Sequence, residues 1–257
     1  MNIFYNHIIW YTKIGVGKIP DTANADLDKS FSCCLCPCLA GAEGGISPRS
    51  LPNITRQKAT TMLLGPGLGY TAQSAARAAE TRELVEKLLP GFGGSAVLDA
   101  DGLNALQGCT ERLCDRRGRV TILTPHDGEF ARLTGKTLRE IASSERTELA
   151  SRFACEHGCI LVLKGHRTLV ALPDGQMLVN TSGCSALSKG GSGDVLTGLI
   201  ASLLCQGADA AQAAALGVWL HGRAGELLAQ KMSAYCASPQ ELLAQGLSLA
   251  FLELLET

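Results

Sequence analysis

Short hydrophobic runs alternate with longer stretches of helical periodicity from about residue 60 to the C-terminus of this 257-residue chain. Runs rich in aliphatic and β-branched residues predict strands, here at 60–64, 96–99, 120–124, 160–163, 168–172 and 176–180. Stretches rich in Ala with Glu, Arg or Leu predict helices, here at 71–89, a short segment from Pro125 to Gly135, 144–157, 194–206, 208–230 and 239–255. This alternation is typical of an α/β fold in which helices cover both faces of a mostly parallel central sheet.

The two ends of the predicted sheet differ from its centre. Pro173-Asp174-Gly175 separates the last two strands and predicts a hairpin, because proline presets one φ angle and glycine tolerates a positive one. The first 35 residues lack the strand and helix rhythm, and only a strand at 3–12 is indicated there. Four cysteines between Cys33 and Cys38 have no second cluster or histidine partners, so strand and loop are favoured over a metal site.

Composition restricts the class of protein. The length and the 46% hydrophobic content suit one α/β domain, and the net charge of -1 without a basic run argues against nucleic acid or an anionic membrane surface as partner. Eleven cysteines in a chain whose start does not resemble a signal peptide indicate a reducing cytoplasm. The most apolar stretch, 195–205, is far shorter than the roughly 18 to 20 residues of a membrane span and predicts a buried helix.

Residues that follow the predicted strands are the first candidates for a site, because ligands bind at the carboxyl ends of parallel strands. The loop after the first strand contains Gly67 and Gly69, which let the backbone approach a ligand, although a simple tight turn explains them equally well. Asp99 and Asn104 belong to the next loop, where carboxylates could hold Mg²⁺ through water or orient a hydroxyl. A helix cap by Asp101 is the alternative there and is slightly favoured.

Two further loops carry charged groups at the same edge. His126 and Glu129 open a helix and are assigned to substrate contact, since no third ligand for a zinc ion is evident nearby. Another loop offers cations, a hydroxyl and glycine-adjacent amides that suit the phosphates and ribose of a nucleotide, through Lys164, Gly165, His166, Arg167 and Thr168. An ordinary charged hairpin start has comparable weight for that loop.

The strongest candidate precedes the apolar helix near residue 195. Gly190, Gly191, Ser192 and Gly193 predict a turn whose amides converge on an anion at a helix N-terminus. Asp194 directly follows this turn, where its carboxylate would be repelled by a bound phosphate. We therefore interpret it as a base that deprotonates an attacking hydroxyl rather than as a helix N-terminal charge.

Several motifs together resemble the ADP/ATP-dependent NAD(P)H-hydrate dehydratase family, which has a ribokinase-like fold. They are GPGLG at 65–69, LDADGLNAL at 98–106, TPHDGEFARLTG at 124–135, LVLKGHRT at 161–168 and NTSGCSALSKGGSGDVLTGLIASLLCQG at 180–207. The resemblance runs from about residue 36 to the end, and it implies a lyase that uses ADP or ATP with Mg²⁺ to dehydrate hydrated NADH or NADPH. By this analogy Asp194 is the base, 164–168 and Gly193 hold the adenine nucleotide, and Gly69, His126 and Asp194 face the hydrated nicotinamide.

The N-terminus departs from the family pattern, which begins with a strand, a glycine-rich segment and a helix of small residues. We therefore expect an atypical segment at 1–35, with this part of the fold incomplete, and a ribokinase-like domain at 36–257. Two alternatives stay open: a vitamin-precursor or sugar kinase of the same fold, and a shortened paralogue that binds nucleotide without turnover. The sequence is compatible with a homo-oligomer and does not separate ADP from ATP or NADH hydrate from NADPH hydrate.

Overall fold

The computed structural model describes residues 9–12, 32–34, 46–55, 59–70, 74–142, 145–235 and 237–256. These residues form one eight-stranded sheet in the order β2-β1-β3-β4-β5-β6-β7-β8. The strands are β1 Ile9–Thr12, β2 Ser32–Cys34, β3 Thr61–Leu64, β4 Ser95–Leu98, β5 Thr121–Leu123, β6 Ile160–Leu163, β7 Leu169–Ala171 and β8 Met177–Val179. The four strands β3 to β6 are parallel, and β1 and β7 run antiparallel to their neighbours, so the predicted mixed sheet with a parallel centre is confirmed.

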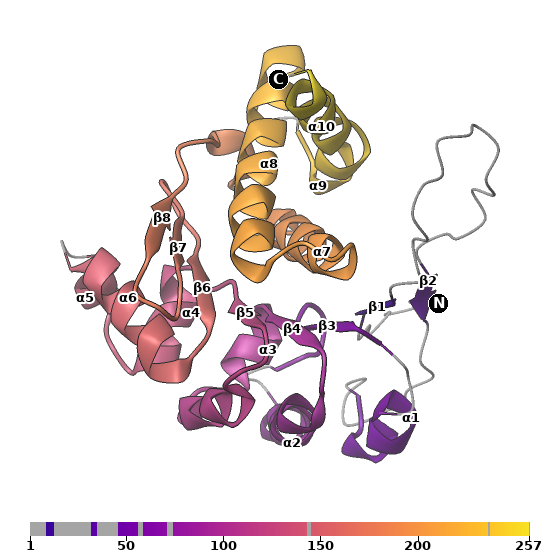
Figure 1. Cartoon of the computed structure of the whole chain (residues 1–257), viewed down its shortest axis with the longest axis vertical. Helices are drawn as coiled ribbons and strands as arrows, with labels where there is room; N and C mark the ends of the chain where they lie inside the picture. The colour runs from indigo at the N-terminus through magenta and orange to yellow at the C-terminus, as the bar shows by residue number, and fades with distance from the viewer. Residues whose placement is uncertain are drawn as a thin grey trace.

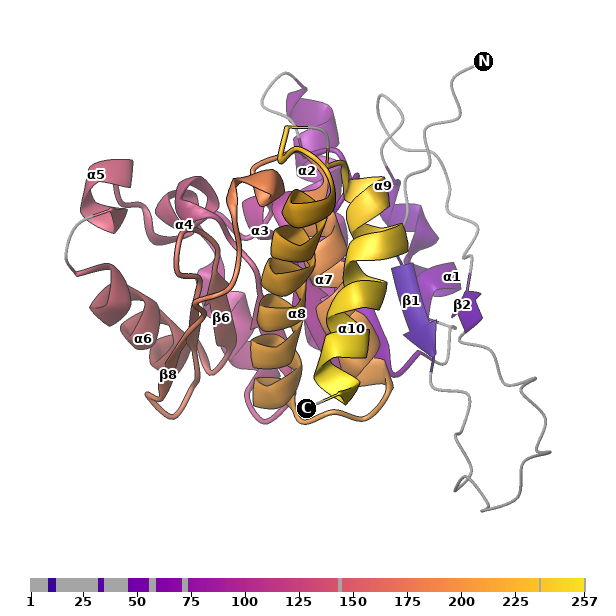
Figure 2. The ribbon, with the colours of Figure 1, turned by 90° about the horizontal axis from the view of Figure 1, so that it is seen from above.

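Helices cover both faces of this sheet, as the sequence predicts (Figures 1 and 2). On one face lie α1 Leu51–Thr55, α2 Ala75–Gly91, α3 Ala100–Asn104, α4 Asp127–Thr134, α5 Leu138–Ile141 and α6 Arg146–His157. On the other face lie α7 Ser192–Cys205, α8 Ala210–Lys231, α9 Pro239–Glu241 and α10 Leu247–Leu255. Short 3-10 turns are η2 Pro48–Ser50, η3 Thr110–Arg116 and η4 Ser185–Leu187, and η5 Leu242–Gly246 is a π-helical turn.

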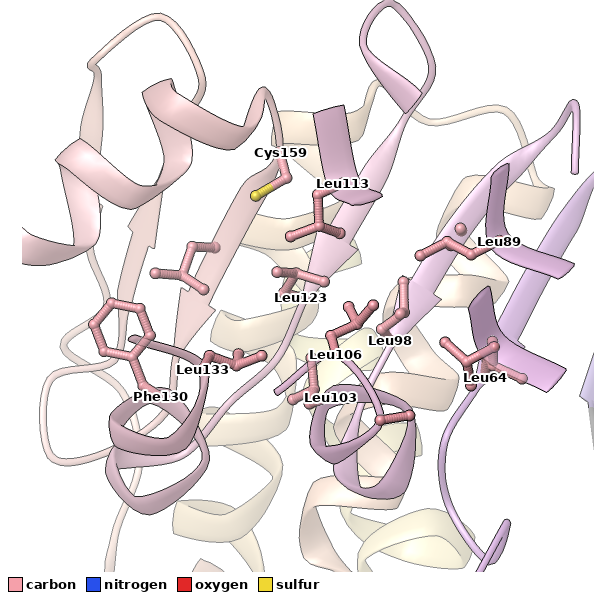
Figure 3. Close-up of a cluster of buried hydrophobic side chains, with 14 of the residues drawn as sticks. Leu64, Leu89, Leu98, Leu103, Leu106, Leu113, Leu123, Phe130, Leu133 and Cys159 are labelled. Carbon is pink, nitrogen blue, oxygen red and sulfur yellow. The ribbon is translucent and has the colours of Figure 1, made fainter. Parts of the chain in front are cut away.

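Alternate residues of each parallel strand enter different cores, which is why these strands are apolar throughout. Leu64, Leu98 and Leu123 pack with α2, α3 and α4 in the larger core (Figure 3). The intervening Val97 and Ile122 pack instead against α7 and α8. Burial of each such side chain contributes about 1.5 to 3 kcal/mol, so the two cores hold the carboxyl ends of the strands in register.

The start of the chain contributes two strands to the edge of the sheet. The expected strand at 3–12 is confirmed over Ile9–Thr12, residues 3–8 lie outside the described residues, and the strand expected in the cysteine cluster is found as β2 at Ser32–Cys34. Cys33 and Cys34 thus lie in a strand, and the rest of the cysteine cluster lies outside the described residues. The prediction that this part of the fold is incomplete also concerns residues that are largely outside the described ones, and it stays a prediction.

The apolar stretch at 195–205 forms most of α7, which is packed between the sheet and α8. Across the residues that the structure describes, no helix has both the length and the apolarity that a membrane crossing requires.

Candidate active site

Helix α7 starts at the glycine-rich turn, at the carboxyl edge of the parallel strands. Gly191 is the N-cap residue, with a left-handed φ of 88° that favours glycine, and its position provides no side-chain cap. An uncapped helix start presents main-chain amides and the positive end of the helix dipole to its surroundings. The turn at 190–193 therefore has main-chain features that favour an anion.

The first turn of α7 is held from behind by His221 of α8. The His221 Nε2 atom lies 3.0 Å from Ser192 Oγ and 2.9 Å from the Ser192 carbonyl oxygen. Burial lowers the pKa of His221 from 6.5 to about 4, so the ring is neutral at physiological pH. A carbonyl oxygen can only accept, which assigns the single ring proton to Nε2 and fixes the Ser192 backbone to α8.

A buried carboxylate and a lysine meet next to this turn. Lys164 Nζ donates to Asp99 Oδ1 at 2.8 Å, and Asp99 is only 2% exposed. The other oxygen, Asp99 Oδ2, accepts a hydrogen bond from Thr197 Oγ1 at 3.0 Å. A Cβ added to Gly193 would lie 3.3 Å from Lys164 Nζ, so the ammonium reaches the edge of the predicted anion site. Loops after β4 and β6 and the start of α7 are thereby joined.

The loop after β5 adds a second buried carboxylate. Glu129 Oε2 accepts from the main-chain N–H of His126 at 2.8 Å and lies 3.8 Å from Lys164 Nζ. In return His126 Nδ1 accepts from the main-chain N–H groups of Gly128 and Glu129, at 2.9 and 3.4 Å, which is a capping box with histidine as the cap. The imidazole is exposed and so is available to a ligand.

Asp194 lies three residues after the Gly191 cap and is exposed, beside these charged groups. The loss of hydration from neighbouring protein atoms raises the pKa of Asp194, and repulsion from Asp99 and Glu129 raises it further against the opposing attraction of Lys164. A carboxylate with a raised pKa at the edge of an anion site is suited to accept a proton from a hydroxyl group.

The structure corrects one interpretation in the loop after β4. Asp101 does not cap α3; the cap residue is Asp99, which makes no side-chain cap hydrogen bond. Asp101 Oδ2 instead accepts from the main-chain N–H of Gly69 at 2.7 Å, and Asn104 Nδ2 lies 3.5 Å from Asp101 Oδ1. The two loops after β3 and β4 are therefore connected, while Gly67 is exposed in the first of them.

The turn at 164–168 is braced from α6. Arg146 Nη2 donates to the carbonyl oxygens of Leu163 and Lys164 at 3.2 and 3.0 Å and pairs with Asp127 at 3.0 Å. Within the turn, the Gly165 N–H donates to Thr168 Oγ1 at 3.3 Å. His166 and Arg167 are exposed, so their side chains can meet a ligand, whereas the Lys164 ammonium points inward to Asp99.

Most of the predicted site residues thus gather at one edge of the sheet, and two residues without a predicted role join them. Thr197 and His221 hold Asp99 and Ser192 in place. Thr197 lies one turn after Gly193 within the motif quoted at 180–207, whereas His221 lies outside the quoted motifs, in the segment VWLHGRAGELLA at 218–229. The spacing of Thr197 places it on the face of α7 that begins at Gly193, which is a usable signal, whereas nothing local relates His221 to Ser192.

Comparison with known proteins gives one consistent result. The sequence profile of NAD(P)H-hydrate dehydratase matches residues 37–246. The bifunctional NAD(P)H-hydrate repair enzyme Nnr of Moorella thermoacetica is 43% identical over 188 residues, which are 73% of this chain and 34% of the relative. The ADP-dependent (S)-NAD(P)H-hydrate dehydratase of Bacillus subtilis is 36% identical over 179 residues, 70% of this chain and 59% of the relative.

Solved structures agree with the sequence match. The ADP/ATP-dependent NAD(P)H-hydrate dehydratase from Bacillus subtilis, co-crystallised with ATP/Mg²⁺, has a TM-score of 0.64 at 29% identity over 81% of this chain and 77% of its own. A ribokinase-like superfamily protein from Enterococcus faecalis, at a TM-score of 0.62 and 23% identity over 80% of this chain and 68% of its own, shares the fold. The matched part of this chain corresponds to only 34% and 59% of the length of the two sequence relatives. The family profile nevertheless covers most of this chain. The chain belongs to the NAD(P)H-hydrate dehydratase family.

Proposed function

We propose that this chain dehydrates the S epimer of hydrated NADH or NADPH and restores the reduced dinucleotide, with ADP or ATP as the phosphoryl donor. The observation that carries the proposal is the placement of Asp194, whose pKa is raised, next to the uncapped glycine turn of α7. Relatives named for this reaction support it, as does the Bacillus subtilis structure with ATP/Mg²⁺. We assign the catalytic domain to residues 36–257. We place the protein in the cytoplasm, where these dinucleotides are used.

The reaction has two balanced stages. In the first, the hydroxyl oxygen at C6 of the hydrated ring attacks the terminal phosphorus of the nucleotide, its proton passes to Asp194, and the bond from phosphorus to AMP or ADP breaks. In the second, the C6–O bond breaks and phosphate leaves, pushed by the lone pair of the ring nitrogen. Transfer of the C5 proton to the departing phosphate or to water then forms the C5–C6 double bond. Phosphate is a much better leaving group than hydroxide, which is the reason to consume a nucleotide.

The residues divide between the two ligands. We assign the nucleotide to the two glycine-containing turns, 164–168 and 190–193, because both expose main-chain amides at the carboxyl edge of the sheet. We assign the hydrated nicotinamide to the opposite side of Asp194, where the contacts would come from Gly67, Gly69, Asp99, Asn104, His126 and Glu129. Asp99 and Glu129 are buried and hydrogen-bonded, so they hold their neighbours in place as well as presenting charge.

The carboxylates near Asp194 fit a magnesium ion that is held mainly by the nucleotide. In the described part of the chain, no group of three acidic, histidine or cysteine side chains is arranged to hold a metal. Mg²⁺ usually keeps several waters and binds phosphate oxygens, and both oxygens of the buried Asp99 carboxylate already accept hydrogen bonds. The nucleotide phosphates and water would therefore hold the ion, and Asp99 and Glu129 would favour it through their negative charge. When bound, the ion would offset the negative charge of the phosphates during transfer.

The test is recovery of the near-ultraviolet absorbance of reduced nicotinamide from hydrated NADH or NADPH with each nucleotide. Asp194→Asn should abolish this recovery and leave the dissociation constant for ADP, measured by titration calorimetry, within about twofold of the wild type, because the base acts in the transition state. Asp174→Asn, in the exposed hairpin turn, is the control and should be fully active. Normal turnover by Asp194→Asn would remove this carboxylate from the mechanism.

The same assay decides the alternatives. Stable phosphorylation of a thiazole, pyrimidine or sugar alcohol, without recovery of reduced nicotinamide, would show a kinase. Binding of ADP with neither reaction would show a nucleotide-binding paralogue.

A further inference from the structure

A hollow of about 410 Å³ lies beside helix α4. Its lining comes from α4 and the turns around it and includes Gln107, Gly128, Arg132, Lys136 and Leu138. We call it the α4 hollow. None of the residues assigned above to the nucleotide or to the nicotinamide ring lines it, so its chemistry is unexplained by the proposed function alone.

Arg132 lies at the boundary between this hollow and the proposed active site. A Cβ added to Gly128 would lie 2.8 Å from His126 Cε1 and 3.9 Å from Arg132 Nη1. The imidazole and the guanidinium therefore both lie close to the same glycine. Gly128 and Arg132 are four residues apart and share a face of α4.

A chain of hydrogen bonds fixes the orientation of Arg132. It runs from the Gly69 N–H to Asp101 Oδ2 at 2.7 Å and across Asp101 to Asn104, whose Oδ1 accepts from Arg132 Nε at 2.9 Å. Because Nε is bound to Asn104, the two terminal amino groups of the guanidinium are left to meet a ligand. Gly69 and Asn104, which we assign to the nicotinamide ring, thus also help to orient the Arg132 guanidinium.

The charge of the hollow is positive. Arg132 and Lys136 line it and no acid does, and within the described ranges neither cation has an acidic partner in an ion pair. The positive charge of Lys136 helps to lower the pKa of Glu140. The Glu140 carboxylate, however, accepts hydrogen bonds from the main-chain N–H and the hydroxyl of Thr137 at 2.7 and 2.6 Å. An anion entering the hollow would therefore meet two cations without displacing an acidic partner.

We propose that the α4 hollow binds the phosphate groups of the dinucleotide substrate through Arg132 and Lys136. The inference rests on the proposed function, which requires a dinucleotide whose ring reaches Asp194 while its pyrophosphate and adenosine extend away from the ring. Arg132 is six residues beyond His126, about 9 Å along the α4 axis. Guanidinium groups bind phosphate oxygens with two parallel hydrogen bonds, which is the recognition that this site needs.

The test compares Arg132→Ala, Arg132→Lys and the control Arg139→Ala, an exposed arginine on α5 that does not line the hollow. Steady-state kinetics would be measured with hydrated NADPH and with hydrated dihydronicotinamide riboside, which carries no phosphate. Arg132→Ala should raise the KM for hydrated NADPH about tenfold, the value for one lost ion pair with phosphate, with kcat and the KM for ADP unchanged. The KM for the riboside should change far less.

Arg132→Lys separates charge from positioning. If Arg132 acts on phosphate, the KM of the lysine variant for hydrated NADPH should lie between those of the wild type and the alanine variant, because the charge remains while the two parallel hydrogen bonds are lost. Arginine variants that raise the KM for the riboside as much as the KM for hydrated NADPH would show that Arg132 only orients Asn104 and would overturn the proposal.

The failure of this inference and of the proposed function are distinguishable. A wild-type protein that restores NADPH, with an Arg132→Ala variant indistinguishable from Arg139→Ala, refutes the subsite and leaves the function standing. A wild-type protein that turns over neither substrate refutes the function, and the subsite with it.

Discussion

Replacement of His221 by glutamine should make the stability of the protein less sensitive to acid. The buried imidazole has a pKa of about 4 in the folded protein and 6.5 in an unfolded chain. As the pH falls below 6.5, the unfolded chain takes up a proton that the folded protein refuses, so unfolding becomes easier. The stability associated with the neutral ring is fully present above pH 6.5 and is lost as the pH falls through about 4.

The magnitude follows from the two pKa values. At about 1.4 kcal/mol for each pH unit between them, the full effect on the free energy of unfolding is about 3 kcal/mol, of which about 2 kcal/mol is lost between pH 7 and pH 5. Glutamine does not titrate in this range, and its amide can donate to the Ser192 carbonyl as the imidazole does. The variant has its own packing cost, but that cost is the same at both pH values and cancels in the comparison.

Urea unfolding followed by circular dichroism at pH 7 and pH 5 measures the effect. The wild type should lose about 2 kcal/mol more than His221→Gln between the two pH values. His166→Gln, which removes an exposed imidazole, is the control and should follow the wild type. An equal acid-dependent loss in wild type and His221→Gln would refute the reasoning, because it would mean that the buried ring does not resist protonation.

Two further predictions concern other buried charges. Arg116 is fully buried and donates to four main-chain carbonyls and to the Thr121 hydroxyl, so Arg116→Met should lower the free energy of unfolding by about 3 kcal/mol or more, and unchanged urea midpoints would contradict this. Asp99→Asn should lower the pKa of Asp194 for two reasons: it removes a negative charge that raises this pKa, and it frees the Lys164 ammonium, whose positive charge lowers this pKa. The acidic limb of the profile of kcat/KM against pH should therefore move to lower pH. A limb that stays in place would show that Asp99 does not act on Asp194 through its charge.

The parallel centre of the fold could be predicted from the sequence because each of its strands is apolar on both faces. The run at 160–163 matches β6 to the residue, and the other strands predicted from residue 60 onward differ from the observed ones by one residue at one or both ends. Short elements such as α5, η3 and α1 were missed, since four to seven residues carry too little periodicity to distinguish a helical turn from a loop.

The final helix shows a different limit. The pattern at 239–255 predicts one helix, and the structure is helical over these residues, but a π-helical turn at 242–246 that the pattern does not indicate lies between α9 and α10. A Cβ on Gly246 would lie 3.0 Å from the Ala224 carbonyl oxygen, so the turn packs closely on α8. Local periodicity holds no information about such a contact, which is made between segments far apart in the chain.

The candidate site was predictable to the extent that its groups follow strands. Asp99, Glu129, Lys164 and Asp194 could be grouped because parallel strands end at one edge of a sheet. Their pairing could not be read from the sequence: Lys164 was assigned to the nucleotide, and the structure directs its ammonium to Asp99. The same lysine still reaches the edge of the glycine turn, so both roles remain open to it.

That pairing has a consequence for how a nucleotide could bind. Three carboxylates, Asp99, Glu129 and Asp194, surround the single ammonium of Lys164, which is already hydrogen-bonded to one of them. A di- or triphosphate brought to the glycine turn would add several negative charges to a region whose own charge is negative. The amides and the dipole of α7 offset only part of this repulsion, because a helix start carries about half a unit of positive charge. A nucleotide must therefore arrive with its own cation, and the carboxylates that repel free phosphate become neighbours that favour the magnesium complex.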